Sequence, residues 1–294
     1  GQVLADGGAW VPGRTIESHA PKPEQIRQPQ DVVLYTRDLS FGYDFPLGEH
    51  IDLEFHSGEV TALTGRNGVG KSTLGLTLAG LLKPIAGRVC MADDLVPPHR
   101  ENNVITWKSR DLLGRIGMVF QSYDLFPNKT VLGNITLAPT LVQKRDKAEV
   151  EKEAIALLER VGLADRKDAW PHELSGGQRQ RVAICRALIL HPEVLLFDEV
   201  TAALDPEMVR EVLDVMLELA DSGQTMLIVT HEMQFARAIA DQVIMLEDGG
   251  IVEQSDDAEA FFTNPKTERA KRFLHTFEFD RHRKPAEPTG TSAE

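Results

Sequence analysis

The residues from Gly65 to Ser72 have the spacing of a loop that binds phosphate groups. Their sequence is GRNGVGKS, and its glycines let backbone N–H groups surround phosphate oxygens without a side-chain clash. The loop follows an apolar run at 60–64 and opens a helix expected over 71–82, so the positive end of the helix dipole would face the same phosphates. The pattern therefore predicts that Lys71 contacts the β and γ phosphates of a nucleotide and that Ser72 ligates Mg²⁺.

Two acids follow an apolar run further along the chain. Val194 to Phe197 precede Asp198 and Glu199. This pattern is typical of a buried parallel strand, and the carboxyl ends of such strands are where α/β sheets place their ligands. Asp198 is suited to a direct or water-mediated contact with Mg²⁺. Glu199 is suited to orient and polarise an attacking water, a role worth roughly 10²–10⁴ in rate.

Apolar patterns and turn residues indicate the elements that must hold these groups. Asp205 can cap a helix whose first position is Pro206, where the missing N–H costs nothing. Strands that alternate with helices predict an α/β fold with a mainly parallel sheet covered on both faces. The expected strands are 32–39, 51–55, 60–64, 194–197 and 225–230, and the expected helices are 71–82, 147–161 and 175–190, with a hairpin turning at Asp248-Gly249-Gly250.

The chain divides into three parts. Residues 1–30 mix Gly, Pro and charge without a period, which predicts a flexible N-terminal extension or linker. Residues 31–265 are expected to form the nucleotide-binding domain, in which the helix-rich stretch over about 122–175 forms a small lobe. Residues 266–294 are expected to hold a C-terminal helix and a disordered tail.

Composition argues against some classes of function. The net charge of −13 disfavours a nucleic-acid partner, because such binding depends on clustered Lys and Arg. Cys90 and Cys185 lack the spacing of metal ligands and are expected to be small buried residues in a reducing compartment. No run approaches the ~18 apolar residues of a membrane helix and no signal-peptide pattern opens the chain, so we expect a soluble, cytoplasmic protein that meets the membrane through a partner.

These motifs resemble the ATP-binding subunits of ABC transporters over about residues 32–275. The resemblance rests on the phosphate loop, on Asp198-Glu199 and on Leu174-Ser175-Gly176-Gly177-Gln178, which matches the family signature. It implies a P-loop NTPase (RecA-like) core with a mainly parallel sheet, an antiparallel β subdomain and a small helical lobe. It also implies ATP hydrolysis with Mg²⁺ as cofactor, coupled to transport of a solute.

The resemblance also implies roles for single residues. Gln121 is similar to the loop glutamine that senses Mg²⁺ and the transmembrane partner, and His231 to the switch histidine at the γ-phosphate. Tyr43 is expected to stack on adenine, with Phe41 as the alternative. The implied catalytic residues are Glu199, His231 and Gln121, and the implied Mg²⁺ ligands are Ser72, Gln121 and Asp198. The implied ATP site comprises Tyr43, Gly65, Arg66, Asn67, Gly68, Val69, Gly70, Lys71, Ser72 and Thr73, with Ser175, Gly176, Gly177, Gln178 and Asp205 acting in trans from a second subunit.

The physical chemistry of the signature agrees with an action in trans. Ser175 can cap a helix, and Gly176-Gly177 leave the first backbone donors of that helix bare, which makes a second anion site. The phosphate loop already serves the nucleotide of its own subunit. A second anion site therefore fits ATP held by a partner, which predicts an isologous dimer.

The downstream half is most similar to importers of polar amino acids. The segments that carry this likeness are GMVFQ at 117–121, LFP at 125–127, TVLGNI at 130–135, THEM at 230–233 and NP at 264–265. None of these residues would touch the solute. The partners that this resemblance implies are a second ATP-binding subunit, as a homodimer or a paralogous heterodimer, an integral membrane permease and, indirectly, a solute-binding protein. It places the chain peripherally on the cytoplasmic face of the cell membrane.

The upstream third is more similar to energy-coupling-factor ATPases for vitamins and metal ions. SFGY at 40–43 and the helix at 72–82 carry this likeness, so such an ATPase is the alternative function, and the chain could be a mosaic or the later half of a longer protein. Soluble ABC ATPases of DNA or ribosomes are less favoured, because only about a hundred residues separate the phosphate loop from the signature and the chain has one motif set. A degenerate regulator is disfavoured because the catalytic side chains are present.

Two positions depart from the usual family pattern. Val200 stands where proline usually follows the catalytic glutamate, and the loss of that φ restraint is expected to loosen the turn slightly. Arg66 adds a positive charge beside the phosphate loop, and we expect its side chain to be solvated rather than to contact phosphate.

Overall fold

The computed structural model describes residues 31–91, 112, 114–247 and 249–277. The expected linker over 1–30, the expected tail after residue 277 and the turn residue Asp248 lie outside this part of the chain.

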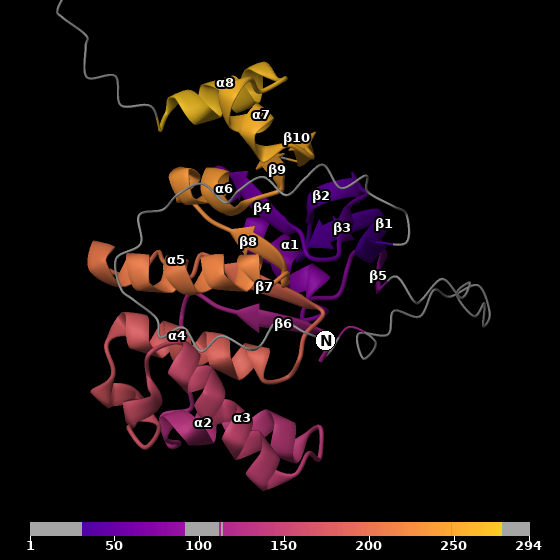
Figure 1. The fold of residues 1–294 in the computed structure, drawn as a ribbon. Helices are drawn as coiled ribbons and strands as arrows, with labels where there is room; N and C mark the ends of the chain where they lie inside the picture. The colour runs from indigo at the N-terminus through magenta and orange to yellow at the C-terminus, as the bar shows by residue number, and fades with distance from the viewer. Residues whose placement is uncertain (1–30, 92–111, 113, 248, 278–294) are drawn as a thin grey trace, which may run out of the picture.

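A central sheet of six strands runs through the molecule (Figure 1). Its order is β10-β9-β4-β8-β7-β6, and all pairs are parallel except β10 with β9, which confirms the mainly parallel sheet. Its strands are β4 (Val60–Gly65), β6 (Ile116–Val119), β7 (Val194–Asp198), β8 (Thr225–Val229), β9 (Gln242–Glu247) and β10 (Gly250–Ser255).

Both faces of the central sheet are buried, which explains why its strands are continuous apolar runs. On β7, Leu195 and Phe197 face one core cluster and Val194 and Leu196 face another. This alternation follows from the period of two along a strand. The first cluster lies under the helices α4 (Gly176–Leu188) and α5 (Pro206–Asp221), and the second surrounds α1 (Lys71–Leu78).

A second, antiparallel sheet covers α1 from the other side. It comprises β1 (Val32–Gly42), β2 (Pro46–Ile51), β3 (Glu54–His56) and β5 (Ala86–Met91), with β1 paired to the other three. The single strand predicted over 51–55 is wrong. The hydroxyl of Thr36 donates to Ile51 O at 2.9 Å and accepts from Leu53 N at 2.8 Å, so a side chain of β1 replaces the ladder there and separates β2 from β3.

The helices begin and end close to their predicted bounds, with one clear difference. α1 ends at Leu78 rather than at residue 82, because Gly80 takes a φ of 73° and the next amides bond back to Leu76. Throughout the described residues, no helix combines the length and the apolar character needed to cross a membrane. The remaining α-helices are α2 (Val131–Leu141), α3 (Lys147–Arg160), α6 (Met233–Ile239), α7 (Ala258–Thr263) and α8 (Glu268–His275).

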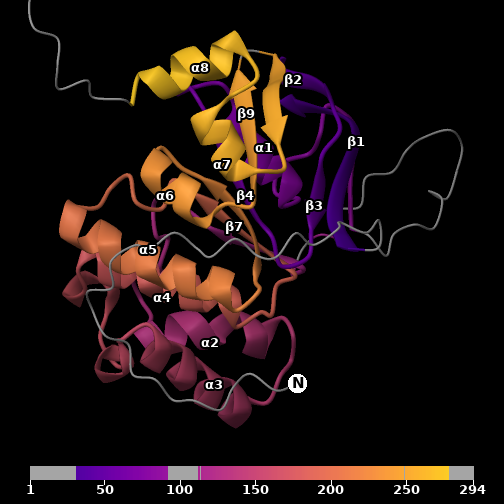
Figure 2. The ribbon, with the colours of Figure 1, turned by 45° about the horizontal axis from the view of Figure 1, so that its top comes forward.

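A helical lobe lies between β6 and β7 in the chain. It contains α2, α3 and the 3₁₀ turns η4 (Ala164–Arg166) and η5 (Pro171–Glu173), and it occupies the end of the molecule opposite α7 and α8 (Figures 1 and 2). Buried Arg181 of α4 joins lobe and core, since it donates to Val161 O at 2.7 Å and to Glu211 of α5 at 2.8 Å.

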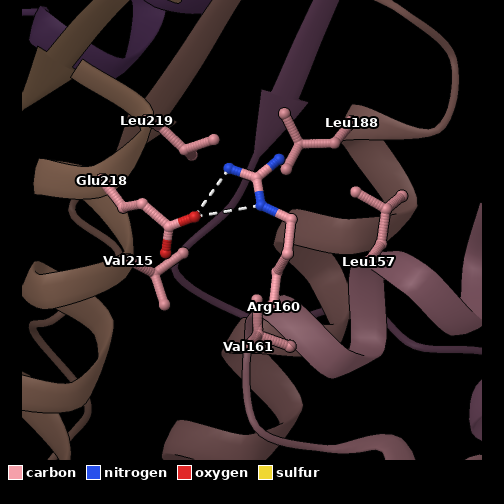
Figure 3. Close-up of a pocket in the computed structure, with 7 residues that line it drawn as sticks. All are labelled: Leu157, Arg160, Val161, Leu188, Val215, Glu218 and Leu219. Carbon is pink, nitrogen blue, oxygen red and sulfur yellow. Dashed lines mark hydrogen bonds and ion pairs between the residues drawn. The ribbon is translucent and has the colours of Figure 1, made fainter. Parts of the chain in front are cut away.

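A second arginine spans the same junction. Arg160 at the end of α3 pairs with Glu218 of α5 at 2.8 Å, and the pair covers a small apolar cavity (Figure 3). The cavity has a volume of about 10 Å³, which is room for one water at most. The apolar side chains that line it are Leu157, Val161, Leu188, Val215 and Leu219.

Glu253 of β10 fixes the C-terminal helices to the sheet. Its buried carboxylate accepts hydrogen bonds from Lys266 N at 2.8 Å and from Thr267 N and Oγ1 at 2.7 Å each. Burial alone raises the pKa of Glu253, but these hydrogen bonds outweigh it, and the net pKa is lowered. The carboxylate is therefore held in its charged form at the start of α8.

We predict that Glu253→Gln lowers the free energy of unfolding by about 1–3 kcal/mol at neutral pH, because an amide cannot accept all three hydrogen bonds. A carboxylate with a lowered pKa stabilises the fold above its ordinary pKa and loses that effect as the pH falls through the lowered value. The difference between wild type and variant in urea denaturation should therefore shrink below about pH 4. Glu268→Gln on exposed α8 is the control and should change little; an equal loss in both variants would contradict the role of Glu253.

Candidate active site

The register of the parallel strands brings four segments to one edge of the central sheet. Asp198 of β7 pairs with Val229 of β8, and Leu63 of β4 pairs with the same Val229. Val119 of β6 pairs with Phe197. The segments that leave these strands at their carboxyl ends are the phosphate loop, Asp198-Glu199, Thr230-His231 and Gln121. The sequence predicted each motif separately, and the register of the sheet explains why the motifs lie close together.

The phosphate loop has a backbone that only glycine fits at its first position. Gly65 has a φ of 142°, and a Cβ there would lie 2.1 Å from Leu246 O. Gly68 and Gly70 also have positive φ, of 83° and 100°. Gly70 is the N-cap of α1 and makes no side-chain cap, so the first N–H groups of α1 face outward as donors for an anion. The loop therefore fits a phosphate chain.

Lys71 places a buried ammonium beside this loop. The side chain is 4% exposed, and its Nζ donates to Gly65 O at 3.1 Å and Arg66 O at 2.9 Å. Burial lowers the pKa of Lys71, although Glu199 and Asp198 act in the opposite direction. Glu199 Oε1 lies 3.8 Å from Nζ. Lys71 is thus within reach of both the loop and the acidic strand end.

Ser72 and Asp198 form the other contact between the loop and the strand end. Ser72 Oγ donates to Asp198 Oδ1 at 2.7 Å. Burial raises the pKa of Asp198, and the hydrogen bond from Ser72 acts against that rise. Two adjoining oxygen ligands fit Mg²⁺, which commonly takes one or two protein oxygens and completes its shell with substrate phosphates and water. Within the described ranges, no group of three His, Cys, Asp or Glu side chains is placed to hold a metal ion.

Glu199 and His231 contact each other above the sheet edge. His231 Nε2 and Glu199 Oε1 are 2.8 Å apart. Glu199 has a φ of 47°, a backbone conformation that is costly for a glutamate, and its N–H donates to Val229 O at 2.9 Å. A strained residue held by the neighbouring strand is typical of a functional position. Val200 after it is buried, so packing fixes the turn even without proline.

The signature forms the start of α4. Ser175 is its N-cap and forms a capping box with Gln178: Ser175 Oγ accepts from Gln178 N at 3.2 Å, and Ser175 N donates to Gln178 Oε1 at 2.9 Å. A Cβ on Gly177 would lie 3.0 Å from Met208 Cβ, so the second glycine is needed for packing against α5. Exposed Asp205 caps α5 at Met208 N.

Of the predicted site residues not yet placed, Val69 and Thr73 are buried and Asn67 is exposed. Gln121, Arg66 and Tyr43 also lie on the surface. Gln121 is exposed two residues after the end of β6, and Arg66 is exposed as expected of a solvated side chain. Tyr43 is 63% exposed and free to stack on a base, whereas the alternative, Phe41, is wrong because it is fully buried. The sequence reasoning missed Phe45, which is 66% exposed in the same turn. An aromatic residue two positions after Tyr43 was the available signal.

The fold and this cluster define a P-loop NTPase. Residues 49–202 match the family described as ABC transporter. The chain is 51% identical over 231 residues to the glutamate transport ATP-binding protein GluA of Corynebacterium glutamicum, covering 79% of this chain and 93% of that protein. It is 49% identical over 221 residues to the glutamate/aspartate import ATP-binding protein GltL of Escherichia coli K12, covering 75% and 89%. The chain belongs to the ABC transporter family of ATP-binding proteins and is an ATPase.

Solved structures agree with this assignment. The structure of cbiO1 from Clostridium perfringens, part of the ABC transporter complex cbiONQ, superposes with a TM-score of 0.68 at 31% identity and covers 85% of this chain and 100% of that chain. The dimeric structure of MJ0796, a bacterial ABC transporter cassette, superposes with a TM-score of 0.63 at 28% identity and covers 76% and 97%.

We predict that Asp198→Asn leaves the stability of the ligand-free protein unchanged or raises it by up to about 1 kcal/mol, and that it abolishes ATP hydrolysis. The substitution removes a buried charge whose pKa is raised, and stability is often gained where a functional group is lost. Thermal melts and an ATPase assay measure both effects. Asp214→Asn is the matched control, because burial also raises the pKa of the Asp214 carboxyl on α5. The Asp214→Asn variant should keep its ATPase activity. A loss of activity in both variants would contradict a specific role for Asp198.

Proposed function

We propose that this chain is the ATP-hydrolysing subunit of an importer for polar amino acids. The observation that carries the proposal is the cluster of Lys71, Ser72, Asp198, Glu199 and His231 at one sheet edge, in a chain about half identical to glutamate transport ATP-binding proteins. An energy-coupling-factor ATPase is the second candidate. It is less favoured, since the likeness to cbiO1 is 31% identity, against 51% and 49% for the amino-acid transport proteins.

In the proposed reaction, Lys71 neutralises charge on the β and γ phosphates. Its ammonium is already dehydrated by burial, so its contact with a phosphate oxygen is stronger than it would be in water. The amides of the phosphate loop and of α1 orient the same phosphates. Ser72 and Asp198, which contact each other, would hold Mg²⁺ together with Gln121, whose role follows from the family resemblance. The ion supplies charge neutralisation between the phosphates when bound.

Glu199 is the proposed base for the attacking water. Its Oε1 lies 2.8 Å from His231 Nε2, so the histidine holds the carboxylate in a fixed orientation. A glutamate held in this way accepts a proton from water while the water oxygen bonds to the γ-phosphorus. The bond from that phosphorus to the bridging oxygen breaks, so that ADP leaves with the bridging oxygen and phosphate is released. A contact of His231 Nε2 with the γ-phosphate would require this nitrogen to leave Glu199.

A second copy or a paralogue completes the proposed site. The start of α4 presents Ser175 and Gly176 partly exposed, and Asp205 is exposed beside them, so these groups are accessible to ATP on another subunit. The dimeric structure of MJ0796 supports this arrangement for a cassette of the same fold. Two identical half-sites facing each other make an isologous interface.

The further partners of the proposed importer are a membrane permease and, through it, a solute-binding protein. We place the chain peripherally on the cytoplasmic face of the membrane, where ATP is available. The proposed domain boundaries are 31–265 for the ATPase domain, with its lobe over about 122–175, and 266–294 for the C-terminal region. No nucleic-acid partner is proposed for a chain of net charge −13.

We predict that Glu199→Gln retains ATP binding and ATP-dependent dimerisation but lowers hydrolysis about 10²–10⁴-fold, because the amide keeps the shape of the carboxylate and cannot accept the proton. Phosphate release measures turnover, and size-exclusion chromatography with ATP measures dimerisation.

Glu232→Gln is the matched control for this substitution. Glu232 is the exposed residue after His231, and its change should leave hydrolysis near the wild-type rate. Near-normal turnover by Glu199→Gln would overturn the proposed role of Glu199.

We predict that Ser175→Arg impairs the ATP bound to the opposite subunit. In mixed dimers in which one subunit carries Ser175→Arg and the other carries Lys71→Ala, both substitutions fall in the same composite site. The other site keeps an intact phosphate loop and an intact signature, so about half of the activity should remain. If both substitutions lie in the same subunit, the intact phosphate loop of the other subunit faces the altered signature and the altered loop faces the intact signature, so hydrolysis should nearly vanish. Equal activity of the two mixed dimers would contradict an action in trans. Ser222→Arg, at the exposed end of α5, controls for the added charge.

A further inference from the structure

Helix α4 contacts the segment around Gln121 on both sides of that residue. Gln180 Nε2 donates to Phe120 O at 3.1 Å, which is the residue before Gln121. Arg186, two turns further along α4, donates from Nη1 to Asp124 O at 2.6 Å and from Nη2 to Tyr123 O at 3.2 Å. Its guanidinium also lies 5.8 Å from the centre of the Phe126 ring. One side of α4 therefore fixes the backbone on both sides of Gln121.

The segment that Arg186 holds has an unfavourable backbone conformation. Tyr123 has a φ of 28° and Asp124 a φ of 44°, two successive residues with side chains in a region that glycine favours. The only local side-chain support on this turn among the described contacts is the hydrogen bond from Ser122 Oγ to Asp124 Oδ2 at 3.0 Å. Such a conformation persists only where the surrounding structure over-determines it. The two carbonyls that Arg186 binds belong to these two residues, so the guanidinium acts where the strain is.

The same segment also contacts the start of α4. A Cβ on Gly176 would lie 3.1 Å from the hydroxyl of Tyr123 and 3.0 Å from Leu204 Cδ2. The guanidinium carbon of Arg179 lies 5.0 Å from the centre of the Tyr123 ring. The Tyr123 ring thus lies against the signature and close to the loop before Asp205, while its backbone is held by Arg186.

We propose that Arg186 is a positioning residue for Gln121. By binding the carbonyls of Tyr123 and Asp124, it holds the strained turn in register with α4, so the distance between Gln121 and the signature is fixed within one subunit. A shift of α4 at its signature end is then passed to Gln121, and with it to the Mg²⁺ site. This inference rests on the proposed function, since it takes Gln121 as part of the hydrolytic site.

The test is Arg186→Lys in the full chain, with the Mg²⁺ dependence of ATP hydrolysis as the readout. A lysine keeps the charge but lacks the planar fork that reaches both carbonyls and lies over Phe126. We expect the Mg²⁺ concentration for half-maximal activity to rise about five- to tenfold, which corresponds to the net contribution of about one ordinary hydrogen bond. ATP affinity measured without Mg²⁺ should stay within about twofold, because the phosphate loop and α1 are untouched.

Arg145→Lys is the matched control. Arg145 donates from Nη1 to Ile189 O at 2.8 Å, so it also binds a backbone carbonyl beside α4, at the C-cap that follows the helix, and not one in the segment around Gln121. Its substitution should lower thermal stability to a similar degree and leave the Mg²⁺ dependence unchanged. A shift of the same size in both variants, or in neither, would overturn the proposal.

A second variant separates strain from general damage. Asp124→Gly removes most of the cost of the positive φ, so the turn needs less support from Arg186. In the double variant Arg186→Lys/Asp124→Gly, the rise in the Mg²⁺ concentration for half-maximal activity should be at most about half of the rise in Arg186→Lys alone, on a logarithmic scale. No recovery would show that Arg186 does not act through this turn. If Glu199→Gln abolishes hydrolysis while Arg186→Lys leaves the Mg²⁺ dependence intact, the positioning role fails and the proposed function stands.

Discussion

The hydrogen-bond register of the parallel strands β4, β8 and β7 is the constraint on which the site depends. Leu63 and Asp198 both pair with Val229, and the amide of Glu199 bonds to Val229 O. A slip of one residue would turn Asp198 to the opposite face of the sheet, because side chains alternate along a strand. The 2.7 Å contact between Ser72 and Asp198, which joins segments 126 residues apart, would then be lost. The apolar cores on both faces fix this register, so the packing of the sheet also sets the chemistry.

The charges of Lys71, Asp198 and Glu199 at the sheet edge offset one another but add little to the stability of the fold. A single buried ammonium would be costly, and two neighbouring carboxylates would repel each other, but Lys71 lies between Asp198 and Glu199 and lowers both costs. Even so, burial raises the pKa of Asp198 and lowers that of Lys71, which means that the charged forms are not at their most favourable here. Buried ion clusters of this kind commonly add little to stability. Their retention at the carboxyl edge of the sheet is therefore best explained by the charge of a bound phosphate chain.

The sequence predicted the parts of the structure that depend on local patterns. The phosphate loop, the acids after β7 and the cap at Ser175 are short motifs whose backbone requirements can be read from residue type, and the structure places them at the predicted elements. The strand over 51–55 was wrong because a hydroxyl from Thr36 interrupts it, and no pattern in that stretch reveals a partner 15 residues away. The bond from Arg186 to Asp124, across 62 residues, could not be predicted for the same reason.

The start of α4 is incompletely satisfied by its own chain, and this bears on how the site is completed. Gln178 N bonds to Ser175 Oγ at a long 3.2 Å, and Gly177 N bonds to the sulfur of Met208 at 3.4 Å, which is a weak acceptor. Helix N-termini with such partners favour an external anion, because the dipole and the free donors act together. The phosphate loop at the start of α1 offers the same chemistry for the chain's own nucleotide. Two anion sites on two helices, one beside the catalytic acids and one without them, are best explained if each is half of a site that a second copy completes.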